Sequence, residues 1–348
     1  MIRLDFWLLL LIGIVSCRTV LKSKGRKLSE QENNDLFDNC GQFVPGHNEN
    51  PMERKSLYGR MVQRGQAPWA ASIRIDAGKY VSVGSGTLIS PRHVLTSAHL
   101  ISTSKIDCEN PENNEYSTKV ENISVLLNVS CSTDELCKTL NRTENLRPLT
   151  VKRVYIQRNY FDRHCFKKIP KDVAILELSE DVKFSSDMYP PCIPTEYPTK
   201  GNEATLYGFG TDPSAPIELN SGILKSINTV VQANCGDEED TEDSFMICTK
   251  TKDSSLACSG DSGSGLIKYS PTGNDTRKAE VIGILTEGES CNNVRLRHIG
   301  DDRADRPRKI YRDVLMRVAD FNEFFCDCCG ICGPGVEIVE ERTYVVLE

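Results

Sequence analysis

The sequence of 348 residues lacks several features that would assign it to a class at once. Its longest apolar run, at residues 6–15, is shorter than the stretch of about 20 residues that a helix needs to cross a bilayer. No internal repeat with a period of about 20 to 50 residues is present, which excludes a solenoid. Positive charge is not in excess either. The net charge of −7 at pH 7 removes electrostatic attraction to phosphate, and this excludes nucleic acid as a partner.

Cysteine, by contrast, is abundant. The chain has 15 cysteines, far more than is usual in a reduced cytosolic protein of this length, and this number predicts an oxidising compartment. The apolar run leads into Ser16, and small residues at Val15 and Cys17 suit signal-peptidase cleavage after Cys17. Residues 1–17 are therefore predicted to be a signal peptide, with a short signal anchor as the alternative. Removal of Cys17 leaves an even number of cysteines.

Four Asn-x-Ser/Thr tripeptides are consistent with passage through the secretory pathway. They begin at Asn122, Asn128, Asn141 and Asn274. We predict a secreted, extracellular glycoprotein that does not contact a membrane once the signal peptide has been removed.

Short β-branched and apolar runs, separated by turn residues, dominate the chain from Pro68 onward. This pattern predicts an all-β fold, either a sandwich or a pair of barrels. The runs lie at residues 72–75, 87–89, 172–178, 204–208 and 280–285. One helix is expected around residues 318–325, because Phe321, Phe324 and Phe325 fall on one helical face.

Four further segments complete the predicted organisation. Residues 18–55 are polar and are expected to form an exposed leader or propeptide with a single anchor, Cys40. Residues 56–325 form the main domain, and within it a polar stretch at about 108–145 has the character of a surface insertion. Residues 326–348 form a cysteine-rich C-terminal tail.

Three separate segments carry residues suited to hydroxyl catalysis. Ser262 lies in the glycine-rich segment Gly-Asp-Ser-Gly, His99 follows a strand-like run, and Asp172 begins another. Serine is a poor nucleophile at neutral pH, so it requires a base within hydrogen-bond reach and a carboxylate that orients the base. Each residue alone is weak evidence. A lone histidine or aspartate is usually structural or solvated.

Taken together and in chain order, these motifs resemble those of the chymotrypsin-like serine peptidases. The matching segments are Thr-x-Ala-His ending at His99, Asp-Val-Ala-Ile-Leu starting at Asp172, and Gly-Asp-Ser-Gly around Ser262. The resemblance covers roughly residues 40–325 and implies two antiparallel six-stranded β-barrels with a C-terminal helix. It implies that Ser262 is the nucleophile, His99 the base and Asp172 the orienting carboxylate. The N–H groups of Gly260 and Ser262 would form the oxyanion hole, and neither a metal nor an organic cofactor is required.

The resemblance also implies activation by cleavage. Alignment places the cut after Lys55, so that the new amino group of Ser56 would pair with Asp261. Ser56 departs from the family's apolar first residue, whose burial would contribute about 1.5–3 kcal/mol. The alternative is a lysine in an exposed linker that is never cut.

The family's disulfide pattern is retained in part. The resemblance implies the pairs Cys40–Cys192, Cys235–Cys248 and Cys258–Cys291. Two family bridges are absent as complete pairs, with Leu100 and Gly84 in one and Ala204 and Lys268 in the other. The remaining cysteines, whose pairing stays open, are Cys108, Cys131, Cys137, Cys165, Cys326, Cys328, Cys329 and Cys332. The last four have a spacing that zinc could also use, but disulfides are favoured in a secreted protein.

The substrate pocket is expected to differ from that of trypsin. Leu256 stands where a carboxylate would select Lys or Arg, and the resemblance implies that Thr286, Glu287 and Gly288 line the wall. The Thr286 hydroxyl is expected to reach Asp172. An apolar or medium-sized P1 side chain is predicted. Lys309 offers an acidic P1 residue as an alternative, unless Lys309 is simply part of a solvated run of charges.

These observations predict a secreted serine endopeptidase that acts through an acyl-enzyme. Its partners would be a protein or peptide substrate, an activating peptidase and protein inhibitors. The main alternative is a non-catalytic binding protein on the same scaffold, which Ser264-Gly265 in place of the family's Gly-Pro mildly favours. A weaker alternative is an inhibitor-regulated scaffold of the extracellular matrix.

Overall fold

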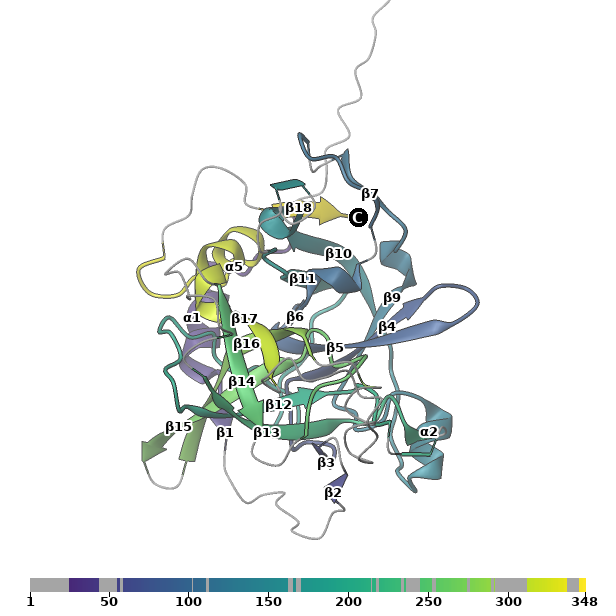
Figure 1. Cartoon of the computed structure of the whole chain (residues 1–348). Coiled ribbons are helices and arrows are strands. Elements are labelled where there is room, and N and C mark those ends of the chain that lie inside the picture. The colour runs from purple at the N-terminus through teal and green to yellow at the C-terminus, as the bar shows by residue number, and fades with distance from the viewer. Residues whose placement is uncertain are drawn as a thin grey trace, which may run out of the picture.

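A computed structural model describes most of the chain (Figure 1). The described residues are 25–43, 55–56, 59–101, 103–110, 113–161, 165–166, 170–213, 215–216, 219–232, 235, 245–251, 255–273, 276–288, 291, 312–336 and 344–348. The predicted signal peptide, the tripeptide at Asn274 and Lys309 lie outside them. Within the described part, no helix combines the length and the apolar character needed to cross a membrane.

Six strands close the first barrel, in the spatial order β11-β6-β5-β4-β9-β10, and β10 pairs back with β11. The strands are β4 (Ala70–Asp76), β5 (Val81–Ser90), β6 (His93–Thr96), β9 (Ile123–Leu127), β10 (Leu149–Gln157) and β11 (Ala174–Leu178). All pairings are antiparallel. Valine, isoleucine and leucine side chains from these strands fill the interior, as β-branched runs on half-buried strands require.

Six further strands close the second barrel, in the order β12-β15-β16-β17-β14-β13, with β12 paired back to β13. They are β12 (Glu203–Gly208), β13 (Lys225–Val231), β14 (Met246–Thr251), β15 (Gly265–Gly273), β16 (Thr276–Glu287) and β17 (Asp313–Arg317). The two closed barrels and the helix that follows them confirm the fold expected from the sequence. Closure gives every strand of each six-stranded barrel two neighbours.

Short elements extend the barrels. Strands β3 (Gly59–Met61) and β2 (Lys55–Ser56) continue the second sheet beyond β13, and β1 (Gln42–Phe43) pairs with β16. Strand β18 (Tyr344–Leu347) adds to β10 of the first barrel. Strands β7 (Thr103–Lys105) and β8 (Glu115–Tyr116) form a separate hairpin, and α2 (Asp134–Thr139) lies in the insertion.

The leader differs from the expected exposed segment, because it contains a helix, α1 (Glu30–Asn39). Ser29 and Glu32 form a reciprocal capping box at its start, which satisfies backbone N–H groups that would otherwise have no partner. Leu28 and Leu36 are buried in the main core cluster, and a disulfide joins Cys40 to Cys192. The leader is therefore a packed part of the molecule.

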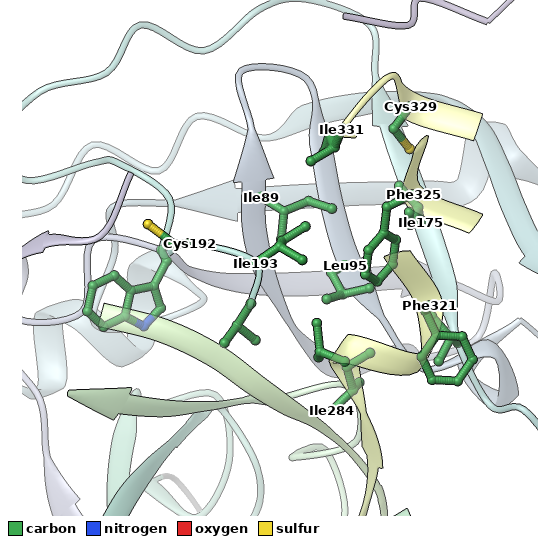
Figure 2. Packing of buried hydrophobic residues seen from close by; sticks show 14 of the residues in the cluster. Ile89, Leu95, Ile175, Cys192, Ile193, Ile284, Phe321, Phe325, Cys329 and Ile331 are labelled. Carbon is green, nitrogen blue, oxygen red and sulfur yellow. The ribbon is translucent and has the colours of Figure 1, made fainter. Parts of the chain in front are cut away.

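The main core lies between the barrels and under the C-terminal helix. Figure 2 shows Ile89, Leu95 and Ile175 of the first barrel facing Ile284 of the second, with Phe325 beside them. The helical region comprises a 3-10 turn at Val318–Phe321 followed by α5 (Asn322–Cys329), close to the expected residues 318–325. Its aromatic face seals the junction of the two barrels.

Six disulfides are formed by the described cysteines. Three of them are the pairs that the resemblance implies, Cys40–Cys192, Cys235–Cys248 and Cys258–Cys291. The others are Cys108–Cys165 and Cys131–Cys137, in or near the insertion, and Cys326–Cys332 in the tail; the first spans 57 residues and the other two span 6 each. Cys328 and Cys329 are buried thiols in contact with each other. The tail and the insertion are thus not joined by any of these bridges.

Candidate active site

The register of two strands in the first barrel brings His99 and Asp172 together. Thr96 at the end of β6 lies opposite Ala174 at the start of β11. Residues just after β6 and just before β11 therefore meet at one edge of the barrel, where His99 sits in a 3-10 turn, Ala98–Leu100. The His99 Nδ1 atom lies 2.6 Å from Asp172 Oδ2, and the His99 backbone N–H donates to Asp172 Oδ1 over 2.8 Å.

This pairing fixes the chemistry of the imidazole. Burial lowers the pKa of His99, but the hydrogen bond and the negative charge of Asp172 together raise it above its usual 6.5. Because Nδ1 faces the carboxylate, Nε2 is left as the atom that can accept a proton. The His99 side chain is 35% exposed, so a substrate can reach it, whereas the Asp172 side chain is 3% exposed.

The second barrel supplies a third donor to the same carboxylate. The Thr286 hydroxyl, at the end of β16, donates to Asp172 Oδ2, which is the contact expected from the sequence. Asp172 is thereby held by groups from both barrels, and the site lies at their junction.

Ser262 belongs to a loop that docks on the first barrel. Its carbonyl oxygen accepts from the Ser85 N–H over 3.0 Å. A side chain at Gly263, which has φ +83°, would overlap Thr96 Oγ1 and the Ser85 carbonyl oxygen. Glycine at this position therefore allows the serine loop to lie against the segment that ends at His99. The His99 ring bonds to Asp172, and among the described residues no hydrogen bond joins His99 to Ser262 Oγ. Such bonds are often longer before substrate binds.

The backbone of this loop has two N–H groups to spare. Those of Cys258, Ser259, Asp261, Gly263 and Ser264 each have an acceptor. Among the described residues, no acceptor meets the N–H groups of Gly260 and Ser262. Gly260 adopts φ +94°, a conformation that favours glycine. The two donors expected to bind an oxyanion are therefore the two that the fold leaves unused.

Asp261 lies beneath the loop and is 4% exposed. Its Oδ1 accepts from the Gly210 N–H over 2.7 Å, and its Oδ2 accepts from the Cys258 N–H over 2.9 Å. Burial raises the pKa of Asp261, while Lys225 and the two backbone bonds act in the opposite direction. The carboxylate ties the serine loop to the loop that follows β12.

The expected pocket residues gather around one segment. Leu256 is buried, Gly288 packs against the Ala257 carbonyl oxygen, and Glu287 is exposed. A side chain at Gly288 would come within van der Waals reach of Asp313 Oδ1. The structure thus places beside the expected pocket residues a carboxylate that the sequence pattern did not reveal. In the sequence, this carboxylate is marked only by the position of Asp313 directly before the apolar residues of the strand Asp313–Arg317.

Asp313 is buried, at 2% exposure, and among the described residues its carboxylate accepts only the Ala257 N–H, at long distances of 3.3 Å to Oδ1 and 3.4 Å to Oδ2. Burial raises the pKa of Asp313 to about 7, and the nearby Asp261 charge acts in the same direction. Burial and the Asp261 charge therefore both disfavour a negative charge on Asp313 that has no positive partner.

The segment expected to be cut is part of a hairpin. Lys55 pairs with Arg60 and Ser56 with Gly59, at the outer edge of the second sheet. In the intact chain the Ser56 nitrogen is therefore held in β2.

Two closed antiparallel barrels with a serine, a histidine and an aspartate at their junction define a chymotrypsin-like serine peptidase fold. A family model described as Trypsin matches residues 57–299, which is more than half of the chain, and the protein belongs to this family. The chain is 28% identical over 249 residues to a protein named trypsin-like protease try-5 from Caenorhabditis elegans, covering 65% of this chain and 74% of that protein. It is 25% identical over 291 residues to serine protease grass from Drosophila melanogaster, covering 79% of this chain and 68% of that protein.

Proposed function

We propose that the protein is a secreted serine endopeptidase in which Ser262 attacks the peptide carbonyl carbon. His99 Nε2 takes the serine proton and later gives it to the leaving amine, and Asp172 stabilises the protonated imidazole. The N–H groups of Gly260 and Ser262 stabilise the tetrahedral oxyanion. The observation that carries this proposal is the pairing of His99 with Asp172 beside a loop that leaves these two N–H groups unused.

An alkyl fluorophosphonate tests this proposal directly, because it labels only an activated serine. We expect stoichiometric labelling of the full chain, complete loss in Ser262→Ala, and unchanged labelling in Ser186→Ala, an exposed serine whose hydroxyl bonds to the adjacent Asp187. Loss of the oxyanion donors or the base would each reduce labelling by about 10²-fold or more. A folded protein that is never labelled, whether intact or cut after Lys55, would support the non-catalytic binding protein instead.

The buried carboxylate at the pocket favours a basic P1 residue in the substrate. The sequence predicted an apolar P1 side chain because Leu256 occupies the family's usual charged position, but β17 supplies a carboxylate from another direction. Among the described residues, Asp313 accepts only the weakly bound Ala257 N–H, so a Lys or Arg side chain would give it a strong charged partner.

Peptide substrates that differ only at P1 test this preference. We expect Arg or Lys to be favoured over Leu and Glu, and Asp313→Asn to lose about 30- to 5,000-fold in kcat/KM for the basic substrates, as truncating one partner of a buried charge pair costs about 2–5 kcal/mol. Because the pKa of Asp313 is about 7, KM for the basic substrates should rise as pH falls below 7. Asp187→Asn, which removes an exposed carboxylate, is the matched control. Equal cleavage after Leu, or preferred cleavage after Glu through Lys309, would contradict the assignment.

The remaining functional features follow from the family. Trypsin-like peptidases are usually secreted and cut protein substrates, so we infer removal of residues 1–17, glycosylation, and encounters with protein inhibitors and other peptidases in the extracellular space. Neither a metal nor an organic cofactor enters the proposed mechanism.

A further inference from the structure

The buried Asp261 carboxylate needs a positive charge. It accepts two backbone N–H groups and lies in an interior where an unpaired ionised carboxylate is costly. Resemblance to the family assigns this charge to the new amino group of Ser56 after cleavage. In the intact chain, however, Ser56 is paired with Gly59 in an edge hairpin, and its nitrogen is part of a peptide bond.

A buried lysine stands opposite the strand position that faces Asp261. Lys225 begins β13 and lies directly opposite Gly208 of β12. Directly opposite residues of an antiparallel pair project to the same face, with Cβ positions about 5 Å apart. A Cβ at Gly208 would overlap Asp261 Oδ1, so the Lys225 side chain starts on the face that carries this carboxylate. Figure 1 shows β12 and β13 side by side in the lower barrel.

The burial of Lys225 and the acidic residues near it agree with this placement. Lys225 is 5% exposed, and a buried ammonium is rarely tolerated without acidic partners. Burial lowers the pKa of Lys225, and the negative charges of Asp261 and Asp212 oppose that effect. Asp212 is also buried and lies in the loop that follows β12. Lys225 therefore shares one interior site with two carboxylates.

The loop that depends on Asp261 is ordered in the uncut chain. Its Gly260 and Ser262 N–H groups are unused among the described residues, and the Gly210 and Cys258 bonds to Asp261 are in place. No contribution from a cleaved amino terminus is needed for this arrangement.

We propose that Lys225 supplies the positive charge that holds Asp261, so that the protein is an active peptidase without cleavage after Lys55. Lys225 is a positioning residue, since it acts on the oxyanion loop through Asp261. The inference rests on the proposed peptidase function and adds the way in which that function is regulated.

The experiment compares intact and cut forms of the full secreted chain. In the intact form, Arg54→Gln and Lys55→Gln prevent cleavage. In the cut form, residues 51–55 are replaced by an enteropeptidase recognition sequence and processed. The readout is the second-order rate of fluorophosphonate labelling at Ser262, supported by kcat and KM on a peptide substrate. We expect the intact form to react within about fivefold of the cut form, because the oxyanion loop is already ordered.

Variants at Lys225 test the charge itself. In the intact chain, Lys225→Met should slow labelling by about 10²-fold and lower kcat more than it changes KM, as loss of oxyanion stabilisation requires. Lys225→Arg should restore most of the rate. Lys250→Met, at an exposed lysine on the neighbouring strand β14, should label like the unaltered chain. Thermal unfolding of each variant shows whether it folds, and Lys225→Met in the cut form shows whether the Ser56 amino group can replace the missing charge.

The outcomes separate the two proposals. If no form reacts, the peptidase function itself fails. If the cut form reacts and the intact form does not, the peptidase function stands and the role of Lys225 is overturned. Equal rates for folded Lys225→Met and the intact chain would also overturn it.

Discussion

The Asp172 carboxylate receives three donors at once, the ring and backbone N–H groups of His99 and the hydroxyl of Thr286. Two of these come from the first barrel and one from the second, so the carboxylate is oriented only when both barrels have folded and docked. The raised pKa of His99 follows from this arrangement. Burial alone would lower the pKa of His99, and the bond and charge of Asp172 overcome that effect.

The pH dependence of reaction should report this balance. Only neutral His99 can act as a base, so labelling by a small alkyl fluorophosphonate should fall on the acidic side with a midpoint above pH 6.5. In Asp172→Asn the raising contributions disappear and burial remains, so the midpoint should move below 6.5, while the maximal rate falls by about 10⁴-fold.

Thr286→Val is the matched control for this profile. It removes one hydroxyl from Asp172 and keeps the charge, so its midpoint should stay above pH 6.5. If the midpoint of the fall in labelling rate at low pH is the same in Asp172→Asn as in the unaltered protein, a group other than His99 determines that midpoint. The small reagent avoids titration of Asp313, because it brings no basic side chain into the pocket.

Single residues also show where sequence reasoning reaches its limit. The sequence predicts His99, Asp172 and Ser262 because each lies in a specific sequence motif. Asp313 and Lys225 stand in ordinary strand segments, and only the strand register shows what they face. A buried charged residue inside a strand indicates that a functional contact is present there. The residue that it faces lies on a different strand, however, so no local sequence pattern predicts that contact.

At the scale of elements, strands with strong β-branched patterns were predicted well and short additions were not. The helix α1 carries a local signal, the Ser29-x-x-Glu32 capping box, but the polar composition of this segment concealed Leu28, just before the helix, and Leu36 within it, which both pack into the core. The helix α2 has six residues, and a helix this short depends on its surroundings, here the Cys131–Cys137 bridge and its buried neighbours.

The C-terminal strand β18 illustrates the same limit. Its pairing with β10 is supported by Arg153, which is buried beside Glu177 and donates through Nε to Glu348 over 2.8 Å. Burying a guanidinium requires carboxylate partners, and the chain end provides one of them. Pairing between residues nearly 200 positions apart depends on topology, so composition could describe this region only as a cysteine-rich tail.

At the scale of the whole molecule, the disulfides fall into those that match the family pattern and those that do not. The three bridges that match the family pattern lie in the leader and the second barrel, while the other three close short loops or link neighbouring segments. The Cys40–Cys192 bridge spans 152 residues and ties the leader to the segment that connects the barrels. Cleavage after Lys55 would therefore divide the backbone without separating the leader from the peptidase domain.

The Cys40–Cys192 disulfide leads to a prediction about the cleaved protein. After enteropeptidase cleavage of the recognition-site form, the protein should run as one species in denaturing gels without reductant and release the leader fragment only when reduced. The paired variant Cys40→Ser with Cys192→Ser, which leaves no unpaired thiol at this bridge, should release the leader without reductant. In the uncut state this variant should lose about 2–5 kcal/mol of unfolding free energy in urea, because the bridge closes a long loop. Release of the leader from the unaltered protein under non-reducing conditions would show that Cys40 is not bonded to Cys192. In the folded protein, the pairing of β1 with β16, the bond from the Leu28 N–H to the Cys329 carbonyl oxygen, and the burial of Leu28 and Leu36 in the core would then hold the leader without this bridge.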